Sequence, residues 1–193
     1  MEQSRRSRKK DTTHHAIMHS AKQLFEKNGI SNVTIENIAE DADVSRSTFF
    51  SHFASLDDLL SQIANEEIRD ILKAAEREDG LDMQAVFTKL AEDTCPYPSL
   101  MCELVVRSIL SEQESSVSDV FRMLSAEIGK SGYDALKKNF SPEDIAALIF
   151  GAYFGLIFRK ITDKEPFDAP EEVIRKIHSF IQHLQYQEEN NHE

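Results

Sequence analysis

The stretch TIENIAEDADVSRSTFFSHF, residues 34–53, decides the fold. Thr34 favours a helix start, and apolar residues then recur at helical spacing from Ile35 to Ala42. Ser45 favours the start of a second, very short helix. Two short helices joined by a tight turn form a helix-turn-helix, whose second helix enters the major groove of DNA.

The second helix of this pair has a polar face that would meet DNA and an apolar face that would meet its own core. The polar residues are Ser45, Arg46, Ser47 and Thr48, and the apolar residues are Val44, Phe49 and Phe53. Arginine pairs bidentately with guanine, and serine or threonine binds bases or phosphates. We therefore expect Arg46 and Thr48 to reach base edges and His52, one turn beyond Thr48, to reach a phosphate.

Residues 12–60 resemble the TetR-type repressor family over a gap-free pattern. The pattern consists of Ala21, Leu24, Phe25, Gly29, Thr34, Ile38, Ala39, Val44, Ser45, Thr48, His52, Phe53, Ser55, Leu59 and Leu60. The resemblance implies an all-α fold of about nine helices, with a three-helix DNA-binding head followed by a helical ligand-binding and dimerisation domain. The DNA-binding residues that we expect in the helix-turn-helix are Thr34, Ser45, Arg46, Ser47, Thr48, Phe50 and His52.

Three residues depart from the family pattern. A glycine that is common in the family's turn is Asp43 here, and aspartate tolerates the left-handed conformation better than most residues. The family's frequent tyrosine in the second helix is Phe50, and its frequent lysine at the start of the fourth helix is Leu56. Both replacements remove a group able to reach phosphate, so they should weaken nonspecific affinity, for which the basic residues at 5–10 can compensate.

Positive charge is concentrated at the N-terminus. Residues 1–55 carry eight Lys and Arg against seven Asp and Glu, whereas residues 56–193 carry 14 against 27, for a net charge of −12. This asymmetry indicates a nucleic-acid-facing end and an acidic body, although basic tails are often only solubilising. From the basic N-terminal arm we expect Arg8, Lys9 and Lys10 to contact DNA.

The rest of the chain also has helical periodicity and no strand pattern. Capping residues, prolines and glycines delimit helices over about 12–28, 56–77, 82–92, 99–110, 141–161 and 170–187, and one from Ser116 past Gly129 and Gly132. The Pro96-Tyr97-Pro98 stretch predicts an extended corner. We divide the chain into a helix-turn-helix domain with its basic arm, 1–55, and a connecting helix with a regulatory and dimerisation domain, 56–193.

Apolar, aromatic and sulfur-containing side chains gather in the middle of the second domain. We expect some of them to line a pocket for a small hydrophobic or aromatic ligand. The candidates are Met101, Cys102, Val105, Ile109, Phe121, Leu124 and Phe154. Ordinary core packing is the alternative interpretation of each residue, and a DNA-bound protein-interaction module without a small-molecule effector is the alternative for the whole protein.

The last two predicted helices carry the candidate dimer interface. Gly151 and Gly155 form a GxxxG pattern, which permits close approach of helices either within one chain or between two subunits. The resemblance favours the second interpretation, because such proteins usually dimerise through their last two helices. The expected interface residues are Ile145, Leu148, Gly151, Gly155, Ile174, Ile177 and Ile181.

The sequence argues against an enzyme and against a cofactor or metal site. It contains no Gly-rich phosphate loop, nucleophile elbow or paired-carboxylate site. His15 and His19 could share a metal, but without a third ligand we interpret them as solvated histidines near DNA phosphates. Cys95 and Cys102 imply no disulfide framework, and ordinary buried thiols are a better interpretation than a redox switch.

Neither secretion nor a membrane span is expected. The N-terminus is charged, and the apolar run 146–158 would span roughly 20 Å as a helix, against a bilayer core of ~30 Å. We therefore expect a cytoplasmic, homodimeric DNA-binding transcriptional regulator. In this interpretation it is a repressor that a small, largely apolar ligand releases from a near-palindromic operator.

Overall fold

Helices form nearly all of the described chain, as the sequence predicts. The computed structural model describes residues 5–78, 80–110, 116–130 and 132–185, with the side chains of residues 5–7, 9 and 116 outside the description. Within these ranges the chain has ten α-helices, one 3-10 helix and one pair of two-residue strands. The expected all-α fold class is confirmed.

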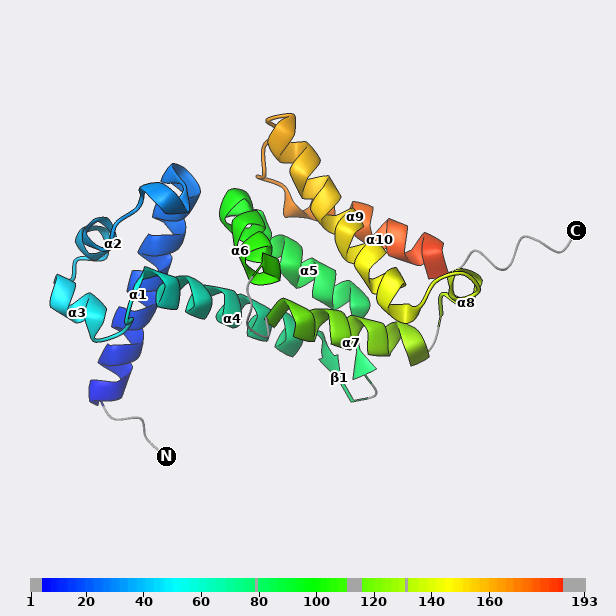
Figure 1. The fold of residues 1–193 in the computed structure, drawn as a ribbon, viewed down its shortest axis with the longest axis horizontal. Coiled ribbons are helices and arrows are strands. Elements are labelled where there is room, and N and C mark those ends of the chain that lie inside the picture. Colours follow the sequence, from blue (N-terminus) through cyan, green and yellow to red (C-terminus); the bar gives the residue numbers. More distant parts are fainter. Residues whose placement is uncertain (1–4, 79, 111–115, 131, 186–193) are drawn as a thin grey trace, which may run out of the picture.

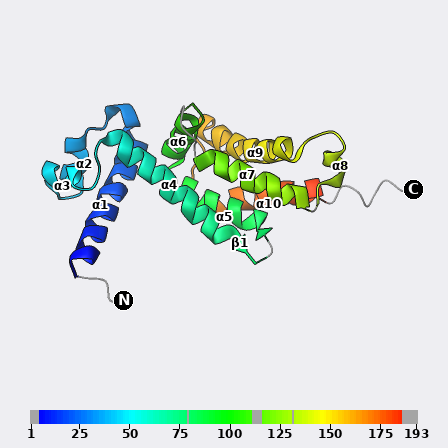
Figure 2. The ribbon, with the colours of Figure 1, turned by 60° about the horizontal axis from the view of Figure 1, so that its bottom comes forward.

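The elements divide in space into a head and a body. In chain order they are α1 (Arg5–Asn28), η1 (Ile30–Asn32), α2 (Ile35–Asp41), α3 (Arg46–Phe50), α4 (Leu56–Ala75), β1 (Glu76–Arg77), β2 (Gly80–Leu81), α5 (Met83–Thr94), α6 (Pro98–Leu110), α7 (Ser116–Lys130), α8 (Asp134–Lys137), α9 (Pro142–Thr162) and α10 (Pro170–Gln185). Figures 1 and 2 show α1, α2 and α3 at one end of the molecule and α8 near the other. We call residues 5–55 the head and residues 56–185 the body; α4 runs from one into the other.

Local capping explains where the helices of the head begin. The Thr34 hydroxyl accepts the backbone N–H of Asn37, and the Asn37 side chain accepts the N–H of Thr34, which completes a capping box. Ser45 accepts the N–H of Thr48 at the start of α3. These caps satisfy N–H groups that have no partner inside the helix, so both short helices have defined starts.

An apolar core beneath α2 and α3 holds the head together. Its buried side chains include Ile17, Ala21 and Phe25 from α1, Ile38 from α2, Phe49 from α3, and Leu59 and Ile63 from α4. Three residues of α6 in the body, Leu100, Met101 and Leu104, belong to the same cluster. The head therefore packs against α6 as well as continuing into α4.

The body is organised around α9. This helix packs chiefly on α7, while α5 packs on α4 and α10. Its buried side carries Ile149, Tyr153 and Ile157. The Tyr153 hydroxyl donates to the carbonyl of Leu90 at 3.1 Å, so the polar end of this buried ring has a partner.

Within the described ranges, α9 is the one helix long and apolar enough for a membrane span by length and composition. One side of it nevertheless forms the centre of the body's core. At its C-terminal end the largely buried Lys160 ammonium contacts the carboxylates of Glu165 and Glu172 at 3.3 and 3.5 Å. These contacts fit the core helix of a globular domain better than a lipid-facing span.

The structure departs from the expected elements at four places. The first helix begins at Arg5 rather than near residue 12, because no breaker precedes Thr12, whose hydroxyl donates to the Arg8 carbonyl inside the helix. The corner before α6 is a tight turn rather than an extended segment, with the Tyr97 N–H donating to the Thr94 carbonyl. The strands β1 and β2 pair where no strand was expected, and α7 ends at Lys130 instead of continuing past Gly132.

Candidate DNA-binding surface and effector cavity

The turn between α2 and α3 has the conformation that a helix-turn-helix needs. Asp43 takes a φ of 52°, in the left-handed region that glycine usually occupies. The N–H of Val44 donates to the carbonyl of Ala39 at 2.9 Å and closes the turn. The expectation that Asp43 tolerates this conformation is confirmed.

The hydroxyl groups at the start of α3 interact with one another. The Ser45 hydroxyl lies 2.8 Å from that of Ser47 and 2.8 Å from that of Thr48, and it also accepts the Thr48 N–H. Ser45 and Ser47 are exposed, and Thr48 is half-buried. Any hydrogen bond from these hydroxyls to DNA must therefore replace or share a bond within the cap.

Arg46 extends from the exposed side of α3. Its guanidinium lies 3.0 Å from a carboxylate oxygen of Glu36 on α2 and 5.5 Å from the centre of the Phe50 ring. An ion pair this exposed contributes little to stability, about 0–1 kcal/mol. The guanidinium can therefore exchange Glu36 for a base edge or a phosphate at small cost.

His52 lies in a cluster at the end of α3 rather than free at the surface. Its ring lies 5.8 Å from the ring of His14 and 6.3 Å from that of Phe53, and its Nδ1 is buried without a hydrogen-bond partner. Burial, with the nearby His14 and Lys10, lowers the pKa of His52 below 6.5. At neutral pH we therefore treat this ring as uncharged.

His14 was not among the residues that we expected to bind DNA, although its ring contacts several groups in the same cluster. It stacks on Phe53 at 4.6 Å between ring centres, and its Nε2 lies 3.7 Å from a carboxylate oxygen of Glu66. A histidine one helical turn after Lys10 was the only sequence signal. The packing of α1 against α3 and α4 places it beside His52.

The basic N-terminal residues form the first turns of α1. Arg8 and Lys10 are exposed there, while the side chain of Lys9 lies outside the described residues. Leu56, which replaces the family's lysine, is half-buried and packs against the head core. Its side chain therefore contributes to the head core, and the phosphate contact that it lacks has no substitute at this position.

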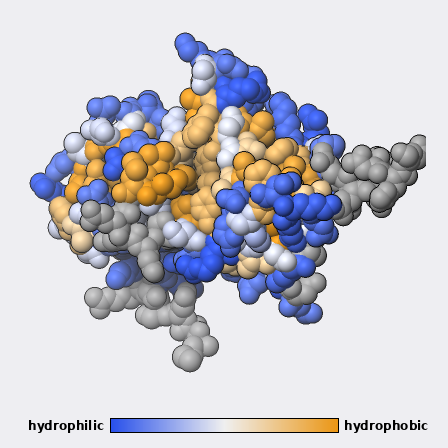
Figure 3. Space-filling model, turned by 45° about the vertical axis from the view of Figure 1, so that its right-hand side comes forward, coloured by the Kyte–Doolittle hydropathy of each residue, from blue (hydrophilic) through white to orange (hydrophobic). Residues whose placement is uncertain are grey.

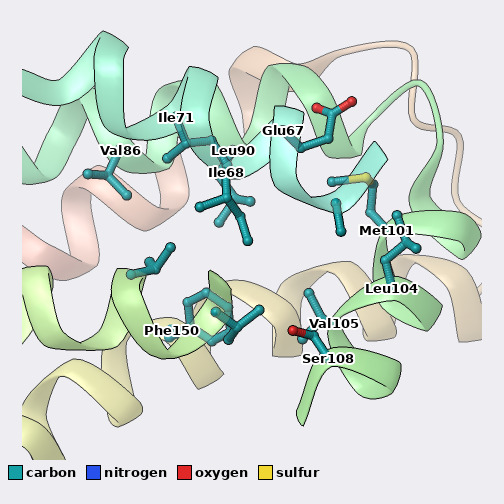
Figure 4. A pocket seen from close by; sticks show the side chains of 13 residues that line it. Glu67, Ile68, Ile71, Val86, Leu90, Met101, Leu104, Val105, Ser108 and Phe150 are labelled. Carbon is teal, nitrogen blue, oxygen red and sulfur yellow. The ribbon is translucent and has the colours of Figure 1, made fainter. Parts of the chain in front are cut away.

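A small apolar cavity lies in the body at the side that faces the head. It has a volume of about 50 Å³ and is lined by residues of α4, α5, α6, α7 and α9. Figure 4 shows Ile68, Leu90 and Phe150 around it, with the Glu67 carboxylate turned away from Phe150. The walls are almost entirely hydrocarbon, so the space suits an apolar group.

The cavity contains two of the seven residues expected to bind a ligand. Met101 and Val105 line it. The other five are not among its lining residues: Ile109 is exposed, Leu124 and Phe154 are buried in the core, and Cys102 and Phe121 are half-buried against that core. Sequence reasoning missed the contributions of α4 and α5, such as Ile68 and Leu90.

Three contacts connect the cavity walls to α1 of the head. Met101 and Leu104 line the cavity on one side and pack into the head core on the other. The Lys22 ammonium of α1 donates to the carboxylate of Glu67, another lining residue, at 2.5 Å. The Glu26 carboxylate of α1 accepts the Leu100 N–H in the first turn of α6 at 2.9 Å. A change in the width of the cavity would therefore alter the contacts of α1.

An exposed apolar stripe runs along the outer side of α9. Leu148 and Phe158 are 50% and 48% exposed, and Gly151 and Gly155 lie between them with no atom within 4 Å of a Cβ built at either position. Figure 3 shows hydrophobic surface bordered by hydrophilic residues on one face of the molecule. The glycines therefore face open space rather than a neighbouring helix of the same chain.

The expected dimer-interface residues divide into two groups. Leu148, Gly151 and Gly155 are exposed, and Ile174 is half-buried. Ile145, Ile177 and Ile181 are completely buried in the chain's own core, so their assignment to a subunit interface is wrong. Helical periodicity identified both sides of α9 as apolar but did not distinguish the inner side from the outer one.

The two cysteines lie in different surroundings and are both free thiols. Burial raises the pKa of Cys102 to about 12, and burial also raises the pKa of Cys95. Thiols in this state are poor nucleophiles at neutral pH. In the described part of the chain, no three His, Cys, Asp or Glu side chains are grouped to hold a metal.

Residues 17–63 match the family described as bacterial regulatory proteins, tetR family. This segment contains the second half of α1, all of η1, α2 and α3, and the start of α4. No protein of curated function matches the sequence.

Solved structures of bacterial transcriptional regulators have the same fold over most of the chain. The TerR/AcrR-family regulator from Aquifex aeolicus VF5 is 17% identical, covers 88% of this chain and 98% of its own, and has a TM-score of 0.62. The fatty acid degradation regulator FadR from Bacillus halodurans is 14% identical, with 90% and 98% covered and a TM-score of 0.64. Salmonella enterica GusR is 18% identical, with 90% and 95% covered and a TM-score of 0.60.

Proposed function

Because the chain carries the TetR-family DNA-binding region and has the fold of TetR/AcrR transcriptional regulators, we propose that it is a homodimeric repressor of the bacterial cytoplasm. Its two heads bind successive major grooves of a near-palindromic operator. A small apolar ligand that binds in the body releases the repressor from DNA.

The observation that carries the DNA-binding part is the surface of α3. Arg46 is exposed on a capped helix that follows a correctly formed left-handed turn. Arginine at the start of a recognition helix can pair bidentately with guanine, and the hydroxyls of Ser47 and Thr48 in the same turn can bind bases or phosphates. The positive charges of Arg8 and Lys10 add affinity that does not depend on sequence.

The exposed stripe of α9 supports the homodimer. Contiguous apolar surface on a water-soluble protein usually marks an interaction site. Gly151 and Gly155 allow the α9 helix of a second copy to approach closely, and Leu148 and Phe158 would then leave water. A two-fold axis beside α9 would present the two heads in opposite orientations, as a near-palindromic site requires.

The small size of the cavity defines how a ligand would act. Ligand pockets usually measure roughly 300–1,000 Å³, so a ligand must widen this cavity of about 50 Å³. Widening separates α6 from α4, and both helices contact α1. A ligand that binds the widened state more tightly shifts the population toward a head arrangement that no longer fits the operator.

The same small volume favours a second candidate, a DNA-bound module that contacts another protein and has no effector. Thermal unfolding in the presence of hydrophobic compounds, followed by DNA binding with the same compounds, distinguishes the two. The effector model predicts that compounds which raise the melting temperature also weaken binding to the operator. Stabilising compounds that leave DNA affinity unchanged would favour the second candidate.

A further inference from the structure

Phe50 is an unusual feature of the head. Phe50 is the only large hydrophobic side chain that is exposed among the described residues of the head, and 45% of its surface is accessible. It lies on α3, the helix that would enter the major groove. A surface aromatic at this position is available to DNA, and it is not one of the residues that form the head core.

The Phe50 ring is held in place from two sides. Its centre lies 5.6 Å from that of the buried Phe49 ring, edge to face, and the Arg46 guanidinium lies over it at 5.5 Å. Arg46 and Phe50 are four residues apart, so their side chains share one face of the helix. The pair therefore presents a cation and an apolar ring together.

Base edges in the major groove offer one apolar group, the methyl group of thymine. A phenyl ring has no hydrogen-bond donor for a phosphate, unlike the tyrosine for which it stands. The neighbouring hydroxyls of Ser45, Ser47 and Thr48 already interact with one another. Among the residues of α3, Phe50 is therefore the best placed for an apolar base contact.

We propose that Phe50 is a specificity-determining residue that contacts a thymine methyl group, while Arg46 binds a nearby guanine. This inference rests on the proposed DNA-binding function. Four residues of helix advance by about 6 Å, whereas base pairs are spaced by about 3.4 Å, so the thymine lies within about two base-pair steps of the guanine. The two half-sites of the operator each contain this combination.

The test begins with selection of duplexes from a random pool by the full-length protein. Each thymine of the selected sequence is then replaced in turn by uracil, which removes only the methyl group. We expect uracil at one symmetric pair of positions to weaken binding about fourfold per half-site, the factor that corresponds to burial of one methyl-sized group. The Phe50→Ala variant should bind thymine and uracil duplexes equally at those positions.

Two further variants complete the test. Phe140→Ala removes a phenylalanine that is exposed on the body and should retain the uracil sensitivity of the wild type. Phe50→Tyr retains the ring and should retain the sensitivity too. If uracil at every position left the affinity of the wild-type protein unchanged, the proposal would be overturned, and packing of Phe50 on deoxyribose would be indicated instead. A selected sequence without thymine near the guanine would also overturn it, and selection of no sequence at all would contradict the DNA-binding function itself.

Discussion

Replacement of Val105 by isoleucine tests the cavity directly. Val105 lines the cavity on α6, and the substitution adds one methylene group that can enter the empty space. Burial of a methylene contributes about 0.8 kcal/mol. At about 24 cal/mol per Å³, the whole cavity of about 50 Å³ corresponds to about 1.2 kcal/mol. We therefore expect Val105→Ile to stabilise the protein by about 1 kcal/mol.

The neighbouring valine provides a matched control. Val106 is 47% exposed on the same helix, so Val106→Ile should change stability by no more than about 0.5 kcal/mol. For a chain of this length, 1 kcal/mol raises the melting temperature by about 2–4 °C, measured at one protein concentration. A loss of about 1–3 kcal/mol in Val105→Ile would indicate overpacking and would refute an accessible space at this position.

The same pair of variants also tests ligand binding. If the cavity is where an apolar ligand binds, Val105→Ile should reduce the thermal shift that such ligands produce, because part of the space is already filled. Val106→Ile should leave that shift unchanged. Equal shifts in the wild type and both variants would place the ligand elsewhere in the protein.

Four other perturbations have defined outcomes. Arg46→Ala should cost about 1–3 kcal/mol on a selected duplex and much less on a scrambled one in fluorescence anisotropy; equal losses would make Arg46 a phosphate contact. The Cβ of a leucine at Gly155 meets no neighbour within 4 Å in the same chain, and leucine improves helix propensity, so Gly155→Leu should remain folded. The added side chain blocks close approach of a second α9, so light scattering should show a monomer near 22.0 kDa in place of a dimer. An intact dimer would exclude this face of α9 as the subunit interface. Lys22→Met leaves the largely buried Glu67 carboxylate unpaired and should cost about 1–3 kcal/mol in urea unfolding. Burial raises the pKa of Glu67, so on acidification this carboxylate becomes neutral in the folded state before it does in the unfolded chain. A neutral Glu67 needs no cationic partner, so the stability lost in Lys22→Met should become smaller as the pH falls through the pKa of Glu67. A stability loss that does not change with pH would exclude the ion pair as the cause of the loss. The pKa of His52 is lowered in the folded protein, so below pH 6.5 the unfolded chain binds more protons than the folded state and the free energy of unfolding should fall. This fall should be absent in His52→Gln. Identical stability-against-pH profiles for the wild type and His52→Gln would assign the proton uptake to another group.

Local interactions explain the parts of the fold that the sequence predicted well. The starts of α2, α3 and α9 depend on the hydroxyls of Thr34, Ser45 and Ser141 and on backbone groups three residues away. Asp43 needs only its own backbone conformation to form the turn. Features determined within a few residues can be inferred from those residues alone.

Other features depend on contacts between distant segments, which periodicity does not identify. Ile145 and Leu148 both belong to the apolar pattern of α9, yet the first is buried in the chain's own core and the second is half exposed. In the same way, five helices meet at the cavity, and their packing selects Val105 but not Ile109 as a lining residue. Two residues per strand are too few to produce an alternating pattern, so β1 and β2 had no sequence signal.

The ion pair of Lys22 and Glu67 illustrates the same limit. The two residues are 45 positions apart, and each is an ordinary charged residue of an amphipathic helix in the sequence. Only the packing of α1 against α4 brings them together beside the cavity. The connection between the head and the apolar cavity was therefore not visible in the sequence.

The central claim is that the head recognises a specific DNA sequence. The most direct measurement compares the affinity of the full-length protein for a duplex selected from a random pool with its affinity for a scrambled duplex of the same length and composition, at one salt concentration. We predict a near-palindromic selected sequence that binds at least roughly 10³-fold more tightly than the scrambled one. Equal affinity for the two duplexes would contradict the account.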